Sequence, residues 1–154
     1  MKKFEILKFY KSIITIQNKN EEKKSRFTYA LVINKNKLEP IVNAIEESKG
    51  TLTDKEKEFI TKRDDIIRRY AKNENGMIYV PEENKEKFLK ETEKIEKEYK
   101  EEIISLNEKD KSYNEMLNEE YEEEINILKV SIDVFPEKMN DELMNGLLYM
   151  IKEE

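Results

Sequence analysis

The spacing of apolar residues predicts that most of this chain is helical. The stretch "SRFTYALVINKNKLEP", residues 25–40, fits two periods, because Phe27, Tyr29, Leu31 and Ile33 alternate as in a half-buried strand. A helical period extends further and covers about five turns. We therefore predict a helix over 24–49, with a break near Pro40 as the alternative, since proline removes a helical hydrogen bond. The residues in helical phase are Phe27, Leu31, Asn34, Leu38, Ile41 and Ile45.

The middle of the chain has the pattern of a helical hairpin. Gly50 is placed to end the first helix, and Thr53 and Glu56 have the spacing of a capping box that starts a second helix over 53–73. "NENG" indicates a turn, and a third helix is predicted over 83–104. The short connection predicts that the two helices pack antiparallel. The residues expected at their contact are Phe59, Ile66 and Tyr70 against Phe88, Ile95, Tyr99 and Ile103.

Short strands are predicted around these helices. "KKFEILKF" fits an opening strand, "MIYV" (77–80) a second, and "LKVSIDVF" a third over 128–135, where apolar and polar residues alternate cleanly. Residues 9–17 are ambiguous between strand and helix, and their β-branched residues favour a strand slightly. A further helical piece is predicted to end in "EEYEEE". The last predicted helix, "NDELMNGLLYMIKEE", has Leu143, Met144, Leu147, Leu148 and Ile151 as its expected inner face.

These elements predict a mainly α fold: a long antiparallel helical hairpin with a small β element and a terminal helix at its base, an α+β arrangement. The chain has 37% apolar and 42% charged residues, and long two-faced helices suit such a composition because each needs only one apolar stripe. We expect a single domain over 1–154. Its parts are an N-terminal strand and helix segment (1–49), the helical hairpin (50–106) and an acidic helix, strand and terminal helix (107–154).

The composition argues against catalysis. The chain has no cysteine and no histidine, so it lacks thiolate ligands and the usual acid–base group near neutral pH. Only three glycines are present, and no phosphate-binding loop, dinucleotide fingerprint, nucleophile elbow or zinc motif occurs. We expect a protein that is not an enzyme and needs no cofactor or metal. No stretch approaches about 18 apolar residues, so we also expect no membrane span and a cytoplasmic location.

Charge is distributed unevenly and marks two candidate binding regions. The net charge is −6, but residues 1–40 hold ten basic and four acidic side chains, whereas residues 82–154 hold eleven basic and twenty-three acidic ones. The glutamates of "NEEYEEE", 118–124, are either a solvated helix face or a docking surface for a basic partner, since concentrated charge steers association. The arginines of "KRDDIIRRY" are either an anion grip or structural ion-pair partners of Asp64 and Asp65. The candidate residues are Glu119, Glu120, Glu122, Glu123, Glu124, Arg63, Arg68 and Arg69.

The basic start of the chain offers an alternative. Lysines alternate there with aromatic residues such as Phe4, Phe9 and Tyr10, a combination used to bind nucleic acid. The chain as a whole is acidic and carries no known nucleic-acid module. Direct nucleic-acid binding is therefore a secondary hypothesis, beside an intramolecular match between this basic segment and the acidic C-terminal half.

Several segments together resemble a family of small uncharacterised tailed-phage proteins. The resemblance rests on "SRFTYALVINKNKLEP", "RRYAKNENG", "EKFLKETEKIEKEY" and "ILKVSIDVFPEKMNDELMNGLLYMIKEE". It implies a phage or prophage origin and an order of strand, helical hairpin, strand and terminal helix, and it implies no functional residues. The long helices with strands at one end also look distantly like prefoldin subunits, which place a β-hairpin between their helices.

The expected function is therefore non-enzymatic binding of another protein. One hypothesis is an inhibitor of a host defence nuclease, with the acidic surface occupying a basic nucleic-acid channel. The alternative is a phage assembly factor or prefoldin-like small chaperone. A homo-oligomer is compatible with either hypothesis.

Overall fold

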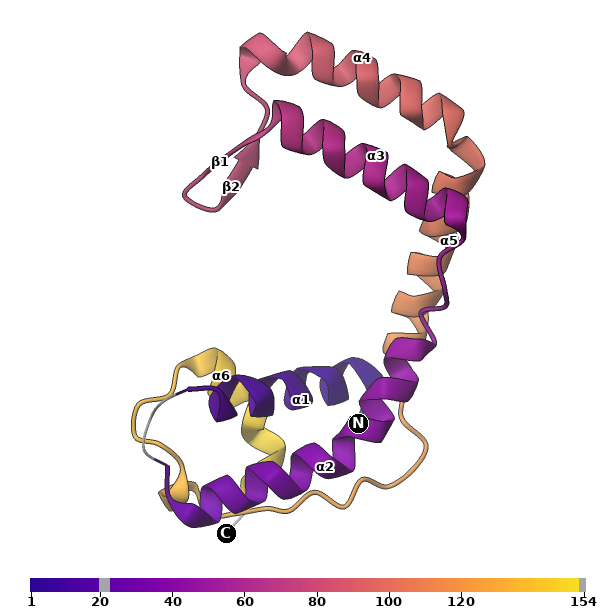
Figure 1. Cartoon of the computed structure of the whole chain (residues 1–154). Coiled ribbons are helices and arrows are strands. Elements are labelled where there is room, and N and C mark those ends of the chain that lie inside the picture. The colour runs from indigo at the N-terminus through magenta and orange to yellow at the C-terminus, as the bar shows by residue number, and fades with distance from the viewer. Residues whose placement is uncertain (20–22, 153–154) are drawn as a thin grey trace. The chain divides into compact units, whose positions relative to one another are not determined.

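The computed structural model describes residues 1–19 and 23–152, and this part of the chain is mainly helical. It contains six α-helices, two short 3-10 helices and one two-stranded antiparallel sheet, which confirms the predicted fold class. The chain forms two compact units: unit 1 comprises 1–49 and 113–154, and unit 2 comprises 50–112 (Figure 1). The expectation of a single domain stays a prediction.

Unit 1 begins with helix α1 (Lys3–Gln17), where a strand was predicted. The opening strand predicted in "KKFEILKF" and the slight preference for a strand over 9–17 are both wrong. Ile6, Phe9, Ile13 and Ile16 are fully buried at helical spacing, whereas Phe4 is 41% exposed. Burial of this stripe in the core outweighs the weak strand preference of β-branched residues, which depends strongly on context.

Residues 25–40, which fit two periods, lie in helix α2 (Ser25–Glu47), so the predicted helix is confirmed. Phe27, Leu31, Asn34 and Leu38 of the predicted stripe are buried, and Tyr29 is 62% exposed. The alternative break at Pro40 is wrong, because the helix continues through it. Pro40 and Asn36, whose carbonyl loses its helical partner, both lie on the exposed face, where water can replace the missing hydrogen bond.

The third predicted strand, 128–135, is wrong. Residues 118–131 instead follow α2 as an extended strap, with only an isolated parallel bridge between Val130 and Ile151, and Ile132–Val134 form a 3-10 turn. The buried side chain of Asn34 forms two hydrogen bonds with the backbone of the strap. Its amide nitrogen donates to the Leu128 carbonyl at 2.9 Å, and its oxygen accepts from the Leu128 N–H at 2.7 Å. The strap therefore pairs with side chains of a helix rather than with another strand.

The last helix, α6 (Asp141–Leu147), is shorter than predicted and continues as a 3-10 turn over Leu148–Met150. Leu143 and Leu147 are buried as expected, but Leu148 is 50% exposed, so its assignment to the inner face is wrong. Where α6 packs on α1, a Cβ on Gly146 would lie 2.7 Å from the Ser12 Cβ. This close approach explains why glycine occupies a helical position.

Unit 2 contains the predicted antiparallel hairpin, formed by α3 (Asp54–Tyr70) and α4 (Glu82–Glu98), which lie side by side in Figure 1. The capping box of Thr53 and Glu56 is present. The predicted apolar contact is confirmed, because its residues form one cluster with Ile60 and Leu106 added. The third helix does not run unbroken to 104: it ends at Glu98, and α5 (Lys100–Leu117) follows after Tyr99 leaves the helical region at φ −111° and ψ 30°.

Between α3 and α4 the chain forms a β-hairpin of β1 (Lys72–Glu74) and β2 (Met77–Tyr79). The "NENG" turn and the strand in "MIYV" are confirmed, whereas β1 was not foreseen. Asn75 and Gly76 both have positive φ, 52° and 83°. Asn-Gly tolerates this conformation best, which is why it closes the tightest hairpins.

A buried carboxylate connects α3 to α5 within unit 2. Glu56 is 1% exposed and accepts hydrogen bonds from Lys109 Nζ at 2.7 and 2.9 Å, from Ser105 Oγ at 2.7 Å and from the Thr53 N–H at 2.8 Å. The bonds from Lys109, Thr53 and Ser105 lower the pKa of Glu56 from 4.5 to about 2. All hydrogen-bonding capacity of this carboxylate is thus used inside unit 2.

This lowered pKa predicts a specific dependence of stability on pH. A carboxyl whose pKa is lower in the folded state stabilises the fold fully above its unfolded pKa, and that contribution is lost as pH falls toward the folded pKa. We therefore expect Glu56→Gln to be less stable than wild type at pH 7, and the difference to shrink between about pH 5 and pH 2. Chemical denaturation at several pH values measures this. Glu86→Gln, at an exposed position of α4, is the matched control, and a Glu56→Gln difference that does not change with pH would contradict the assignment.

Candidate functional site

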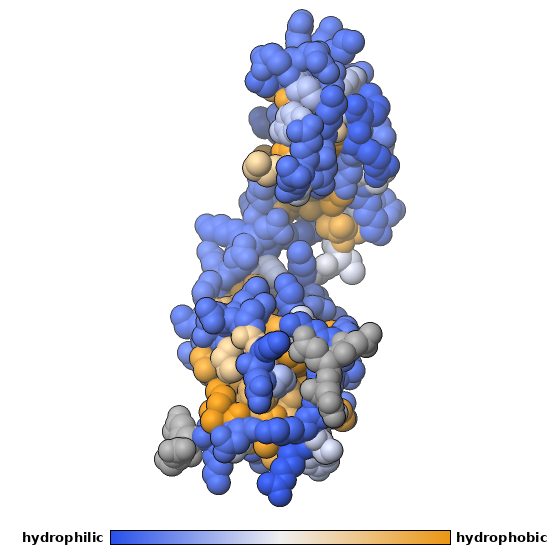
Figure 2. Space-filling view, turned by 90° about the vertical axis from the view of Figure 1, so that its left-hand side faces the viewer, coloured by the Kyte–Doolittle hydropathy of each residue, from blue (hydrophilic) through white to orange (hydrophobic). Residues whose placement is uncertain are grey.

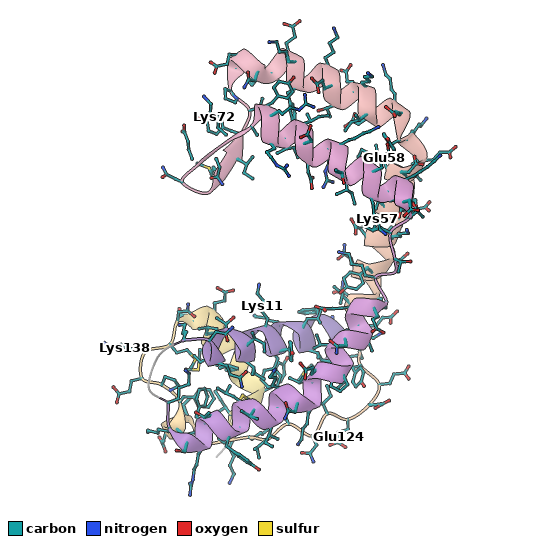
Figure 3. All side chains as sticks on the ribbon, in the orientation of Figure 1. Lys11, Lys57, Glu58, Lys72, Glu124 and Lys138 are labelled. Carbon is teal, nitrogen blue, oxygen red and sulfur yellow. The ribbon has the colours of Figure 1, made fainter. Side chains whose placement is uncertain are left out.

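The acidic segment predicted as a docking surface is not helical. Helix α5 ends at Leu117, and residues 118–124 belong to the strap of unit 1, so the predicted acidic helix is wrong. Five glutamates close together repel one another on a helix, whereas the extended strap separates them and places some beside cations. The chain therefore presents these carboxylates on an irregular segment, on which Figure 3 locates Glu124.

Two of the five glutamates hold the start of the chain. Glu119 pairs with Lys3 Nζ at 2.8 Å, and Glu120 pairs with the amino group of Met1 at 2.8 Å. Backbone hydrogen bonds from the Lys3 N–H to the Glu119 carbonyl and from the Tyr121 N–H to the Met1 carbonyl accompany them. These contacts agree with an intramolecular match between the basic start and the acidic half, and they occupy two residues of the candidate surface.

The other three glutamates of the segment, at 122, 123 and 124, are exposed. Burial of Tyr121 and the negative charge of the nearby Glu123 raise the pKa of the tyrosine. Glu122 and Glu124 form no ion pair with any residue in the described ranges. The surface available to a basic partner is thus smaller than the sequence suggested.

The three arginines of the other candidate group do not converge on one ligand. Arg63 pairs with Asp64 at 3.0 Å and lies over the Phe59 ring. Arg69 pairs with Asp65 at 3.0 Å and with Glu91 of α4 at 2.7 Å. Arg68 is exposed and makes no ion pair with residues 1–19 or 23–152. Asp65–Arg69 is the one predicted intrahelical pair that forms, since Asp64 contacts Arg63 instead of Arg68.

Arg69 belongs to a polar network that crosses from α3 to α4. Tyr70 donates its hydroxyl to Glu91 at 2.6 Å, and Lys62 contacts Glu98 at 3.3 Å. The bonds from Tyr70 and Arg69 lower the pKa of Glu91, and the bond to Glu91 raises the pKa of Tyr70. These side chains border an open groove of about 580 Å³ between the two helices.

Sequence reasoning missed an exposed apolar group on the β-hairpin. Met77 is 73% exposed, Ile78 68% and Tyr79 40%. Alternate residues of a strand point to opposite faces, so both faces of β2 carry uncovered apolar side chains. The available signal was "MIYV" itself, because β1 ("KNE") offers no apolar residues to pack against it.

Comparison with known proteins identifies no relative. No protein-family model matches the chain, no curated protein matches it, and no solved structure matches it. Within the described ranges, no group of three or more carboxylates is placed to hold a metal ion. None of the helices described is long and apolar enough to cross a membrane.

Proposed function

We propose that this protein acts by binding another protein, without catalysing a reaction, and that the β-hairpin of unit 2 makes the contact. The observation that carries the proposal is the exposure of Met77, Ile78 and Tyr79 in succession. Hydrophilic residues cover most of the face of unit 2 shown in the upper part of Figure 2. An exposed apolar group in such surroundings is typical of a protein-interaction site.

The hairpin has a suitable form for binding an extended segment. Its two strands pair only with each other in the described part of the chain, so each leaves one backbone edge open. An open edge can add a strand from a partner, whose side chains then contact the exposed faces. Isolated two-stranded hairpins are marginally stable in water, and a partner that covers this one would stabilise it.

The acidic strap supports a second candidate, the inhibition of a host nucleic-acid enzyme such as a defence nuclease. Its support is the exposure of Glu122, Glu123 and Glu124. Ionised carboxylates accept charge-assisted hydrogen bonds from the Arg and Lys side chains of a basic channel. This candidate includes the phage or prophage origin and a location in the host cytoplasm, both implied by the resemblance noted above.

Protein binding through the hairpin could also serve a phage assembly factor or a prefoldin-like small chaperone. The β-hairpin between α3 and α4 agrees with that resemblance, in which a hairpin lies between two long helices. A phage structural protein among the bound partners would favour this form, and a nuclease would favour inhibition.

Capture from host lysate with three matched variants tests the proposal. Met77→Thr with Ile78→Thr removes the two most exposed apolar side chains of the hairpin but keeps good strand formers. Leu89→Gln removes another exposed leucine, on α4, as a control. Replacing Glu122, Glu123 and Glu124 with lysine reverses the acidic strap. We expect the hairpin variant to bind the captured protein at least tenfold more weakly, a loss of about 1.4 kcal/mol, and the Leu89→Gln control to bind normally.

The acidic variant separates the two candidates. If the partner is lost on charge reversal and by added salt, but kept by the hairpin variant, the acidic strap is the site and the hairpin proposal is wrong. Partners that bind all variants equally contradict both candidates.

A further inference from the structure

The groove between α3 and α4 carries an excess of positive charge. Five of its lining side chains are cationic and three are carboxylates, so its net charge is +2. Two isoleucines line its base: Ile66 is 3% exposed and Ile95 is 7% exposed. The groove therefore combines a cationic border with a narrow apolar base, which suits an acidic segment that also presents an apolar side chain.

Three lysines of α4 supply this excess. Lys62 and Arg69 of α3 are engaged across the groove by Glu98 and Glu91. By contrast, Lys87 and Lys90 are exposed and make no ion pair with the residues described, and Lys94 has only a longer-range attraction to Glu91. The residues at 87, 90 and 94 share one helix face, with about 10.5 Å between the first and last positions at 1.5 Å per residue.

A complementary stripe lies on α5 in the same unit. Glu101, Ile104 and Glu108 have the same spacing as the three lysines and share one face of the helix. Ile104 is 50% exposed. Both glutamates are exposed and form no ion pair within the described ranges. The inner face of α5 is occupied separately, by Ser105 and Lys109 bonded to Glu56.

We propose that this groove is a self-association site and takes the acidic stripe of α5 from a second copy of the chain. The two glutamates are about 10.5 Å apart along their helix, so they meet Lys87 and Lys94 whichever way the helices run. Ile104, between them, faces the apolar base of the groove. Opposite charges at matched spacing give the contact its register.

In the proposed dimer a two-fold axis relates the two copies, so that both contacts form at once. Each copy then gives its stripe and receives its partner's, so the contact is closed and stops at a dimer. The exposed charges at its border make the dimer sensitive to ionic strength, because salt screens such pairs over about 8–10 Å.

Sedimentation of the full chain at low and high salt tests self-association, and charge reversal tests the assigned surfaces. One variant changes Lys87, Lys90 and Lys94 to glutamate, and the other changes Glu101 and Glu108 to lysine. A control changes the exposed lysines at 11, 129 and 138 of unit 1 to glutamate, and so matches the first variant in net charge. We expect wild type and control to dimerise at low salt, and each reversed variant to dimerise at least tenfold more weakly.

Mixing the two reversed variants gives the decisive result. In a mixed dimer, the acidic groove of the first variant meets the basic stripe of the second. The basic groove of the second variant and the acidic stripe of the first are unchanged, so that contact also forms. Recovery of the dimer only on mixing is the expected outcome. A wild type that stays monomeric at every salt concentration, or a dimer that either reversal leaves intact, would overturn the proposal.

Two further outcomes would also overturn it. Reversed variants that stay monomeric when mixed would show that groove and stripe do not meet. Binding of an oligothymidylate to wild type, lost in the lysine variant while no dimer forms, would assign the groove to nucleic acid. Circular dichroism of each variant confirms that its helices are intact.

Discussion

Replacing Asn34 with leucine is expected to destabilise the protein by about 2–4 kcal/mol. The change leaves both the N–H and the carbonyl of Leu128 without their partner, and each buried unsatisfied group costs about 1–3 kcal/mol. The expected total lies below the largest sum because Leu128 is only partly buried and water can reach part of its backbone. Chemical denaturation measures the loss.

The same substitution two residues further along α2 provides the control. Asn36 is exposed, so Asn36→Leu is expected to change stability by less than about 0.5 kcal/mol. Hydrogen exchange adds a local measurement, since the Leu128 amide should exchange quickly in Asn34→Leu and slowly in the control. If both variants are equally stable, Asn34 does not hold the strap.

Ile95→Ala is expected to cost about 2–5 kcal/mol, the usual range for removing most of a buried aliphatic side chain. Ile95 is 7% exposed and packs in the cluster of unit 2 with Phe59, Ile66 and Tyr99. The cavity left behind lies between two helices that the charged network of Arg69 and Glu91 also holds in place. The helices therefore cannot close the space without disturbing those pairs.

Leu89→Ala is the control for this second substitution. Leu89 lies on the same helix and is 56% exposed. Alanine is an excellent helix former, so the control should lose less than about 0.5 kcal/mol. A loss that small for Ile95→Ala would mean that the packing phase of α4 is wrong.

The parts of the fold that could be predicted are those where one periodic signal dominates. The stripe from Phe27 to Ile45 and the stripes that pair α3 with α4 each extend over several turns, and each gave the right element and the right inner face. The capping box at Thr53 and the "NENG" turn correctly predicted where α3 begins and where the chain turns, because each depends on hydrogen bonds and backbone angles within a few residues.

The parts that failed depend on contacts distant in sequence. The alternation in "LKVSIDVF" is typical of a strand, but within residues 1–19 and 23–152 it pairs only through the isolated bridge between Val130 and Ile151. Asn34, 94 residues earlier, satisfies the backbone at Leu128 instead. In the same way, Ile13 and Ile16 of α1 are buried by a core built from the two ends of the chain, and this burial decides between the two periods.

The candidate site was only partly accessible for the same reason. The sequence shows five glutamates together, but not that Glu119 and Glu120 pair with the first residues of the chain. Nor does it show that Met77, Ile78 and Tyr79 stay uncovered, because an apolar strand is usually buried. The solvent exposure of a side chain depends on the whole folded structure, and a local sequence pattern is a poor predictor of it.

The division of unit 1 into two segments has a consequence for the order of folding. Its strap is joined to α2 through Asn34 and through Lys37, whose Nζ donates to the Asn126 carbonyl 89 residues away. Unit 2 is one continuous segment and can form as soon as residues 50–112 have been synthesised, whereas unit 1 is complete only when residues 113–154 join α1 and α2. Contacts this far apart in sequence slow folding, because closing the long intervening loop costs entropy before the contacts stabilise the fold. During synthesis, the part of the unit 1 core that Phe135, Leu143, Leu147 and Met150 cover therefore stays exposed until residues 113–154 are present. Apolar surface that is exposed on an incomplete fold favours aggregation.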